Sequence, residues 1–121
     1  MRFARSVLFL AAGMVTGAGP TQAHHALATE YDLNRSVTVV GTVTKFEWAN
    51  PHVRLYLDTR AAGVSDPMRW ELEMASPNLL ELNGLKIDSL RIGDQVTVTA
   101  YPARNSPNLG YALKVSYRAH I

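Results

Sequence analysis

The sequence contains no cysteine among its 121 residues. This absence excludes disulfide bonds, thiolate metal sites and cysteine nucleophiles, so a metal ion would have to be held by histidine, carboxylate or amine groups. Acidic residues are missing from the first 23 positions, which hold two of the 12 basic residues. The other 98 residues therefore carry ten positive and ten negative side chains. A domain without excess positive charge lacks the basic face that binds phosphate backbones, so we expect no nucleic-acid partner.

Long apolar runs are also missing, and the longest, residues 6–15, has about ten residues. Because a membrane-spanning helix needs roughly 20 apolar residues, we expect no transmembrane segment. This run follows a short basic start and precedes small, turn-forming residues at positions 16–23, the pattern of a secretory signal peptide. We predict cleavage near Ala23 and a periplasmic or secreted mature protein. Cleavage there places a free α-amino group on His24, next to His25.

The mature sequence alternates between apolar and polar residues, which indicates half-buried β-strands. From Val37 the apolar residues occupy every second position until about Thr44, where the alternation changes parity and predicts a bulge. Ser76 and Pro77 begin a short helix that ends at Asn83. Five strands are predicted, near residues 37–48, 53–58, 68–74, 96–102 and 109–117.

Three strands, one short helix and two further strands is the element order of the OB-fold, a small five-stranded all-β barrel. A small antiparallel β-sandwich is the alternative, because alternation does not determine how strands pair. We predict a signal peptide over residues 1–23, an amino-terminal arm over 24–36 and an OB-like domain over 37–121. The side chains expected to point into the barrel are those of Val39, Val43, Leu55, Leu57, Leu72, Val96, Val98, Leu113 and Val115.

Several short motifs are spread over the mature chain. They are His24-His25-Ala26, Tyr31-Asp32, Val37 to Val43, Trp48-Ala49-Asn50-Pro51-His52, Trp70-Glu71-Leu72-Glu73, Ser76-Pro77-Asn78 and Gly93-Asp94-Gln95-Val96-Thr97-Val98. In these motifs the sequence resembles an uncharacterised family of small exported bacterial proteins that carry a domain of unknown function. The most specific part of the resemblance is the histidine pair after the leader, together with the Trp-x-Asn-Pro-His motif. The resemblance implies a periplasmic setting and brings no activity with it.

The histidines are the candidate metal ligands. An amino-terminal His24 can bind Cu(II) through its amine and ring nitrogens, and His25 adds a second imidazole. His52, at the corner between the first two predicted strands, can complete the site if the arm folds back across the barrel end. The alternative is that Asn50 and His52 only satisfy backbone groups at a tight corner. Copper is favoured over zinc by the affinity order for nitrogen ligands. The alternative is that two exposed terminal histidines bind metals adventitiously.

The remaining polar and aromatic residues indicate no catalytic site. Trp48 and Trp70 lie on the apolar parity of their strands and are expected to pack in the core. Glu71 and Glu73 alternate with apolar residues and are expected to form a solvated strand face. His120, beside the carboxyl terminus, is expected to be frayed. No nucleophile and base occur together, so an enzyme is the least supported class.

Two functions from different classes remain open. One is a periplasmic module that binds a transition metal through its amino-terminal histidines. The other is a non-catalytic module of the cell envelope that binds a saccharide or an exported protein. Neither of these two functions predicts whether the chain is a monomer or an oligomer.

Overall fold

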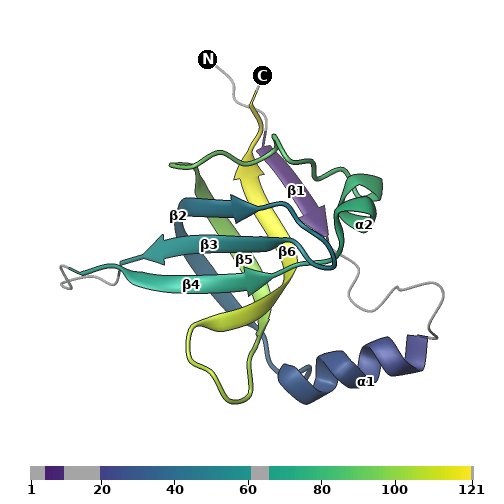
Figure 1. The fold of residues 1–121 in the computed structure, drawn as a ribbon. Helices are drawn as coiled ribbons and strands as arrows, with labels where there is room; N and C mark the ends of the chain where they lie inside the picture. Colours follow the sequence, from purple (N-terminus) through teal and green to yellow (C-terminus); the bar gives the residue numbers. More distant parts are fainter. Residues whose placement is uncertain (1–4, 10–19, 61–65, 121) are drawn as a thin grey trace.

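The computed structural model describes residues 5–9, 20–60 and 66–120 and shows a β-barrel with two short helices (Figure 1). One of these helices lies between the third and fourth barrel strands, as predicted. In chain order the elements are β1 (Arg5–Phe9), α1 (Pro20–Glu30), β2 (Val37–Glu47), β3 (Arg54–Thr59), β4 (Met68–Glu73), α2 (Pro77–Leu82), β5 (Gln95–Pro102) and β6 (Leu109–Arg118).

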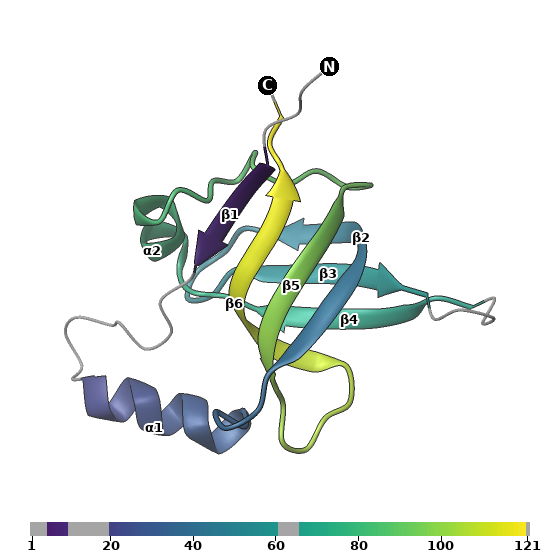
Figure 2. The ribbon, with the colours of Figure 1, turned by 180° about the vertical axis from the view of Figure 1, so that it is seen from behind.

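The strands from β2 to β6 close into a barrel. β2 pairs with both β3 and β5, β3 pairs with β4, and all of these pairs are antiparallel. β6 closes the barrel by pairing in parallel with β4 and antiparallel with β5. Figure 2 shows β5 and β6 side by side across the back of the barrel. The prediction of a small OB-like barrel is therefore confirmed, and the sandwich alternative is not adopted.

Two elements precede the barrel. β1 pairs antiparallel with the carboxyl-terminal half of β6 and lies within the predicted leader. The predicted arm is helical as far as Glu30, and α1 extends away from the barrel toward its amino end (Figure 1). The leader positions 1–4 and 10–19 lie outside the described residues. No helix in the described ranges is long and apolar enough to cross a membrane.

A bulge bends β2 where the sequence predicts it. Val43 pairs with Leu57 and Lys45 pairs with Tyr56, so Thr44 is the extra residue and the buried parity changes there. Just before the bulge, β2 passes close to β3: a Cβ atom on Gly41 would lie 2.6 Å from the carbonyl oxygen of Asp58. Glycine is required at this position because any larger residue would push the two strands apart.

The core lies inside the barrel and contains eight of the nine predicted inward residues, each at most 4% exposed. Leu113 is the exception, because Thr99 pairs with Lys114 and Ala100 with Ala112, which leaves Leu113 as the extra residue of a second bulge. Ala112 takes its place in the core. The tryptophans are partly buried and pack against the core, as expected.

Candidate functional site

The corner between β2 and β3, residues 48–53, is held against the end of β4. Backbone hydrogen bonds run from Val53 N–H to the Ala75 carbonyl (3.1 Å) and from Met74 N–H to the Val53 carbonyl (2.8 Å). The Asn50–Pro51 peptide bond is cis, and Val53 is fully buried. The corner is thus attached to the end of β4 at Val53, directly after the Trp-x-Asn-Pro-His motif, which gives His52 a defined place.

The His52 ring is oriented by a backbone carbonyl. Its Nδ1 lies 2.9 Å from the Met74 oxygen. A carbonyl oxygen can only accept, so Nδ1 carries the hydrogen, and the neutral ring has its lone pair on Nε2. The side chain is 42% exposed. Metal-binding histidines commonly donate one ring N–H to a carbonyl or carboxylate and bind the metal through the other nitrogen.

Glu73 lies next to His52 and is largely buried. Its Oε1 is 3.8 Å from His52 Nδ1, and its side chain is only 12% exposed. Its Oε2 accepts a hydrogen bond from the Tyr31 hydroxyl. The expectation of a solvated face is therefore wrong for Glu73, because the arm covers that part of β4. Glu73 links the end of the arm to the β2–β3 corner.

Tyr31 anchors the arm to the barrel and is 1% exposed. It forms an isolated bridge with Ala103, and the neighbouring Asp32 N–H donates to the Pro102 carbonyl at 2.9 Å. Arg104 holds the end of α1 by donating from its backbone N–H to the Glu30 carbonyl (2.9 Å) and from Nε to the Ala28 carbonyl (2.8 Å). The arm is therefore docked at its carboxyl end.

Two tyrosines form the apolar wall of this cluster. The rings of Tyr31 and Tyr111 lie 5.7 Å apart at a tilted angle. Burial and the hydrogen bond to Glu73 raise the pKa of Tyr31 far above its ordinary value. Burial, together with the charge of Glu73, raises the pKa of Tyr111 to about 12. Both phenols therefore stay protonated at neutral pH, and the carboxylate is the negative group of the cluster.

The amino-terminal histidines lie on α1, away from this cluster. His24 and His25 are exposed, and the His25 carbonyl accepts a hydrogen bond from Thr29 Oγ1 at 2.8 Å. Within the described ranges, no three His, Asp or Glu side chains are grouped to hold a metal ion. The structure thus brings His52 and Glu73 together, and it does not bring His24 or His25 to them.

The outer face of β3 and β4 carries a connected polar network. Tyr56 donates to Glu71 Oε1 at 2.8 Å, and Arg54 Nη1 lies 3.7 Å from Glu71 Oε2. Lys45 lies over the Tyr56 ring at 5.3 Å from its centroid. Cations and carboxylates are mixed on this face, which carries Arg54, Asp58, Arg69 and Glu71 and is continued on β2 by Lys45 and Glu47.

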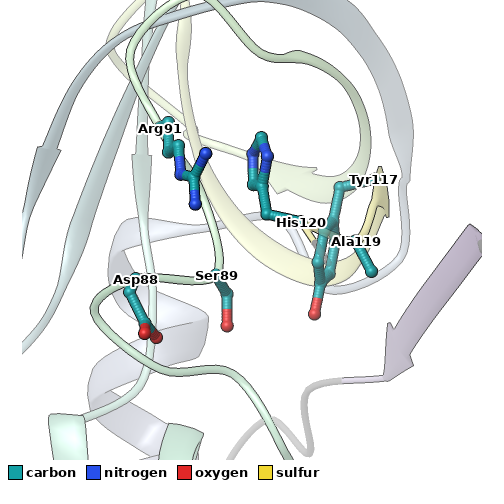
Figure 3. A pocket seen from close by; sticks show the side chains of 6 residues that line it. All are labelled: Asp88, Ser89, Arg91, Tyr117, Ala119 and His120. Carbon is teal, nitrogen blue, oxygen red and sulfur yellow. The ribbon is translucent and has the colours of Figure 1, made fainter.

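The carboxyl-terminal tail is attached to the barrel. His120 Nε2 lies 2.7 Å from Asp94 Oδ2, so the expectation that His120 is frayed is wrong. Beside this contact is a small cavity of about 170 Å³ between the α2–β5 connection and the tail (Figure 3). Its lining residues are Asp88, Ser89, Arg91, Tyr117, Ala119 and His120.

The sequence placed His52 at a strand corner, as the structure does, and it did not predict the contact between Tyr31 and Glu73. These two residues are 42 positions apart, and their contact depends on how the arm crosses the barrel. The available sequence signal was Tyr31 itself, an aromatic residue in the mostly polar stretch from Glu30 to Arg35, where Leu33 is the other apolar residue.

Comparisons with known proteins agree with the fold. A protein-family model described as a family of unknown function (DUF6152) matches residues 11–112. No curated protein sequence matches the chain. Among solved structures, the mitochondrial single-stranded DNA-binding protein Rim1 from S. cerevisiae matches with a TM-score of 0.54 and 10% identity. The match covers 71% of this chain and 96% of that chain. At this identity the likeness concerns the fold alone.

Proposed function

This chain belongs to DUF6152, a family of unknown function, and we propose that it is an exported, non-catalytic β-barrel protein that binds a transition metal. Copper is the favoured metal and zinc the second. The ligands are the amine and ring of His24, the ring of His25 and Nε2 of His52. The observation that carries the proposal is the hydrogen bond from His52 Nδ1 to the Met74 carbonyl, which leaves Nε2 as the metal-binding nitrogen.

The arm is docked beside His52. Tyr31, at the end of α1, and His52 both lie against the carboxylate of Glu73. His25 is six residues before Tyr31. Six residues of fully extended chain span about 20 Å. Docking at Tyr31 therefore keeps the two terminal histidines within reach of the corner, which supports a shared site.

Cleavage after Ala23 loosens the segment that carries the histidines. It removes residues 20–23 from α1 and leaves seven helical residues, fewer than an isolated helix needs in water. The new positively charged amine at the helix start also opposes the helix dipole. Both effects favour unwinding of the first turn, which frees His24 and His25 to approach His52.

Copper titration of three proteins tests this site. The protein of residues 24–121 should bind one Cu(II), and a version with one glycine before His24 should bind at least about tenfold more weakly because it lacks the His24 amine as a ligand. His52→Ala should weaken binding by a similar factor. His120→Ala is the matched control, since His120 contacts Asp94 instead. Affinity should also fall as the pH is lowered, because protons compete with the metal for imidazole and amine nitrogens.

The outcomes separate the ligands. Equal copper affinity with and without the added glycine would exclude the His24 amine as a ligand. Equal copper affinity after His52→Ala would exclude His52 as a ligand. If neither change matters, the metal proposal fails and the second candidate function takes its place.

That second candidate is a binding module for a cell-envelope saccharide or an exported protein. It is favoured by the outer face of β3 and β4, the face through which OB-folds bind oligosaccharides and oligonucleotides. There Tyr56, Arg54 and Glu71 present a half-exposed aromatic ring beside paired polar groups. The mixed charge of this face suits a neutral ligand better than a phosphate backbone.

Export itself is tested by mass. The intact mass of protein recovered from the periplasm should correspond to residues 24–121, because the basic start, apolar run and small residues form a cleavable leader. A mature protein that retains residues 1–23 would contradict export with cleavage.

A further inference from the structure

We propose that the cavity between the α2–β5 connection and the carboxyl-terminal tail binds a small zwitterion, a free α-amino acid with a short side chain. The six residues that line the cavity are labelled in Figure 3. None of them belongs to the leader, to α1 or to the His52 corner. The cavity is therefore separate from the histidine site of the proposed function.

Two side chains of opposite charge line this cavity without pairing. Arg91 provides a guanidinium and Asp88 a carboxylate. Figure 3 shows the two groups apart, and among the described residues neither group forms a hydrogen bond or an ion pair. A guanidinium binds carboxylates through paired hydrogen bonds, and a carboxylate accepts hydrogen bonds from an ammonium group. A zwitterion can therefore pair with both side chains, whereas a ligand with a single charge would pair with only one.

Neutral groups complete the lining. Ser89 Oγ accepts a hydrogen bond from the Lys86 N–H at 2.8 Å, so the hydroxyl hydrogen remains available for a ligand carboxylate. The half-buried Tyr117 ring packs against the core and, together with Ala119, adds apolar surface to the cavity. A cationic group, an anionic group and apolar surface match the three parts of an α-amino acid, which are a carboxylate, an ammonium group and a side chain.

The volume of the cavity limits the size of the ligand. About 170 Å³ corresponds to the liquid volume of about five or six water molecules at roughly 30 Å³ each. Glycine and alanine have about as many non-hydrogen atoms. The cavity is smaller than the roughly 300–1,000 Å³ of pockets that bind drug-sized ligands. A long side chain or a peptide would therefore have to extend into solvent.

Hydrogen bonds within the chain hold both walls of the cavity in place. In the α2–β5 connection, the Ser89 N–H donates to the Lys86 carbonyl at 3.0 Å. The Asp94 N–H donates to the Arg91 carbonyl, also at 3.0 Å. Asp94 Oδ2 accepts from the Arg91 N–H at 2.9 Å and lies 2.7 Å from His120 Nε2, so Asp94 connects the two walls. A site that is formed before binding loses less conformational entropy when the ligand binds.

Amide chemical shifts measured by NMR test the proposal on the full chain of residues 1–121. The probes are alanine, propionate, which lacks the ammonium group, and ethylamine, which lacks the carboxylate. Alanine should bind at least about threefold more tightly than either, with shift changes within residues 86–94 and 117–120. Arg91→Gln should abolish the preference for alanine over ethylamine. Asp88→Asn should abolish the preference for alanine over propionate.

Lys86→Gln and Glu81→Gln are the matched controls. Each removes one exposed charge near the cavity from a residue that does not line it, so the alanine affinity should stay the same. Absence of alanine binding, or an affinity for alanine equal to that for propionate or ethylamine, would overturn the proposal. Preferences that survive Arg91→Gln or Asp88→Asn, or control variants that weaken alanine binding as much, would also overturn it.

Discussion

Tyr31 joins the amino-terminal arm to the barrel through its buried side chain. Its ring is buried against Tyr111, and its hydroxyl donates to the largely buried carboxylate of Glu73. A buried carboxylate that loses a donor is left partly unsatisfied, which costs more than an average hydrogen bond contributes. The contact therefore supports both the docking of the arm and the negative charge beside His52.

We expect Tyr31→Phe to lower the free energy of unfolding by about 1–3 kcal/mol at pH 7. The pKa of Tyr31 is raised in the folded protein, so the folded state holds this proton while the unfolded chain loses it above about pH 10. The stability that depends on the proton is fully present below that pH and declines above it. The difference in free energy of unfolding between the unmodified and the Tyr31→Phe protein should therefore become smaller as the pH rises. Denaturant unfolding from pH 7 to 11 measures it.

Tyr56→Phe is the matched control for this prediction. Tyr56 also donates to a glutamate, but Glu71 is more exposed and lies near Arg54. Removal of the Tyr56 hydroxyl should lower the free energy of unfolding by less than about 1 kcal/mol. A Tyr31→Phe protein as stable as the unmodified one would show that the arm is not held by this hydrogen bond.

At the scale of elements, β2 depends on a close contact with β3. The strand bends at Thr44, and before that bend Gly41 lies against the Asp58 backbone. Gly41→Ala places a methyl group 2.6 Å from the Asp58 oxygen, so the two strands must separate.

We expect Gly41→Ala to destabilise the protein by about 1–3 kcal/mol, the usual cost of inserting a group where no space exists. Thermal or denaturant unfolding measures this. Val40→Thr, at an exposed neighbouring position, keeps a β-branched residue and should change stability by less than about 0.5 kcal/mol. Similar stability of the Gly41→Ala protein would mean that β2 and β3 can separate at little cost.

At the scale of the whole molecule, the buried core begins at Tyr31. The buried hydrophobic residues of the described chain extend from Tyr31 to Val115, and the strands that enclose them are β2 to β6. Among the described strands, β1 pairs with β6 alone, at the edge of the sheet. The barrel should therefore fold without its first 23 residues.

We expect the protein of residues 24–121 to unfold cooperatively, with a Tm within a few degrees of that of the full chain. The protein of residues 32–121 lacks Tyr31 and should lose about 3 kcal/mol or more, which lowers the Tm by more than about 10 °C. Calorimetry of the three proteins measures this. A non-cooperative transition of the 24–121 protein would show that the leader belongs to the folded domain.

The sequence by itself determined the strands, the short helix capped by Ser76, the bend near Thr44 and the barrel class, because alternation, turn residues and caps act over a few neighbouring positions. It also identified His52 as a residue at a strand corner. Only the tertiary structure decided that Leu113 leaves the core and that Glu73 is covered by Tyr31. Both depend on pairing between segments far apart in the chain, where the position of a partner strand or arm outweighs local alternation.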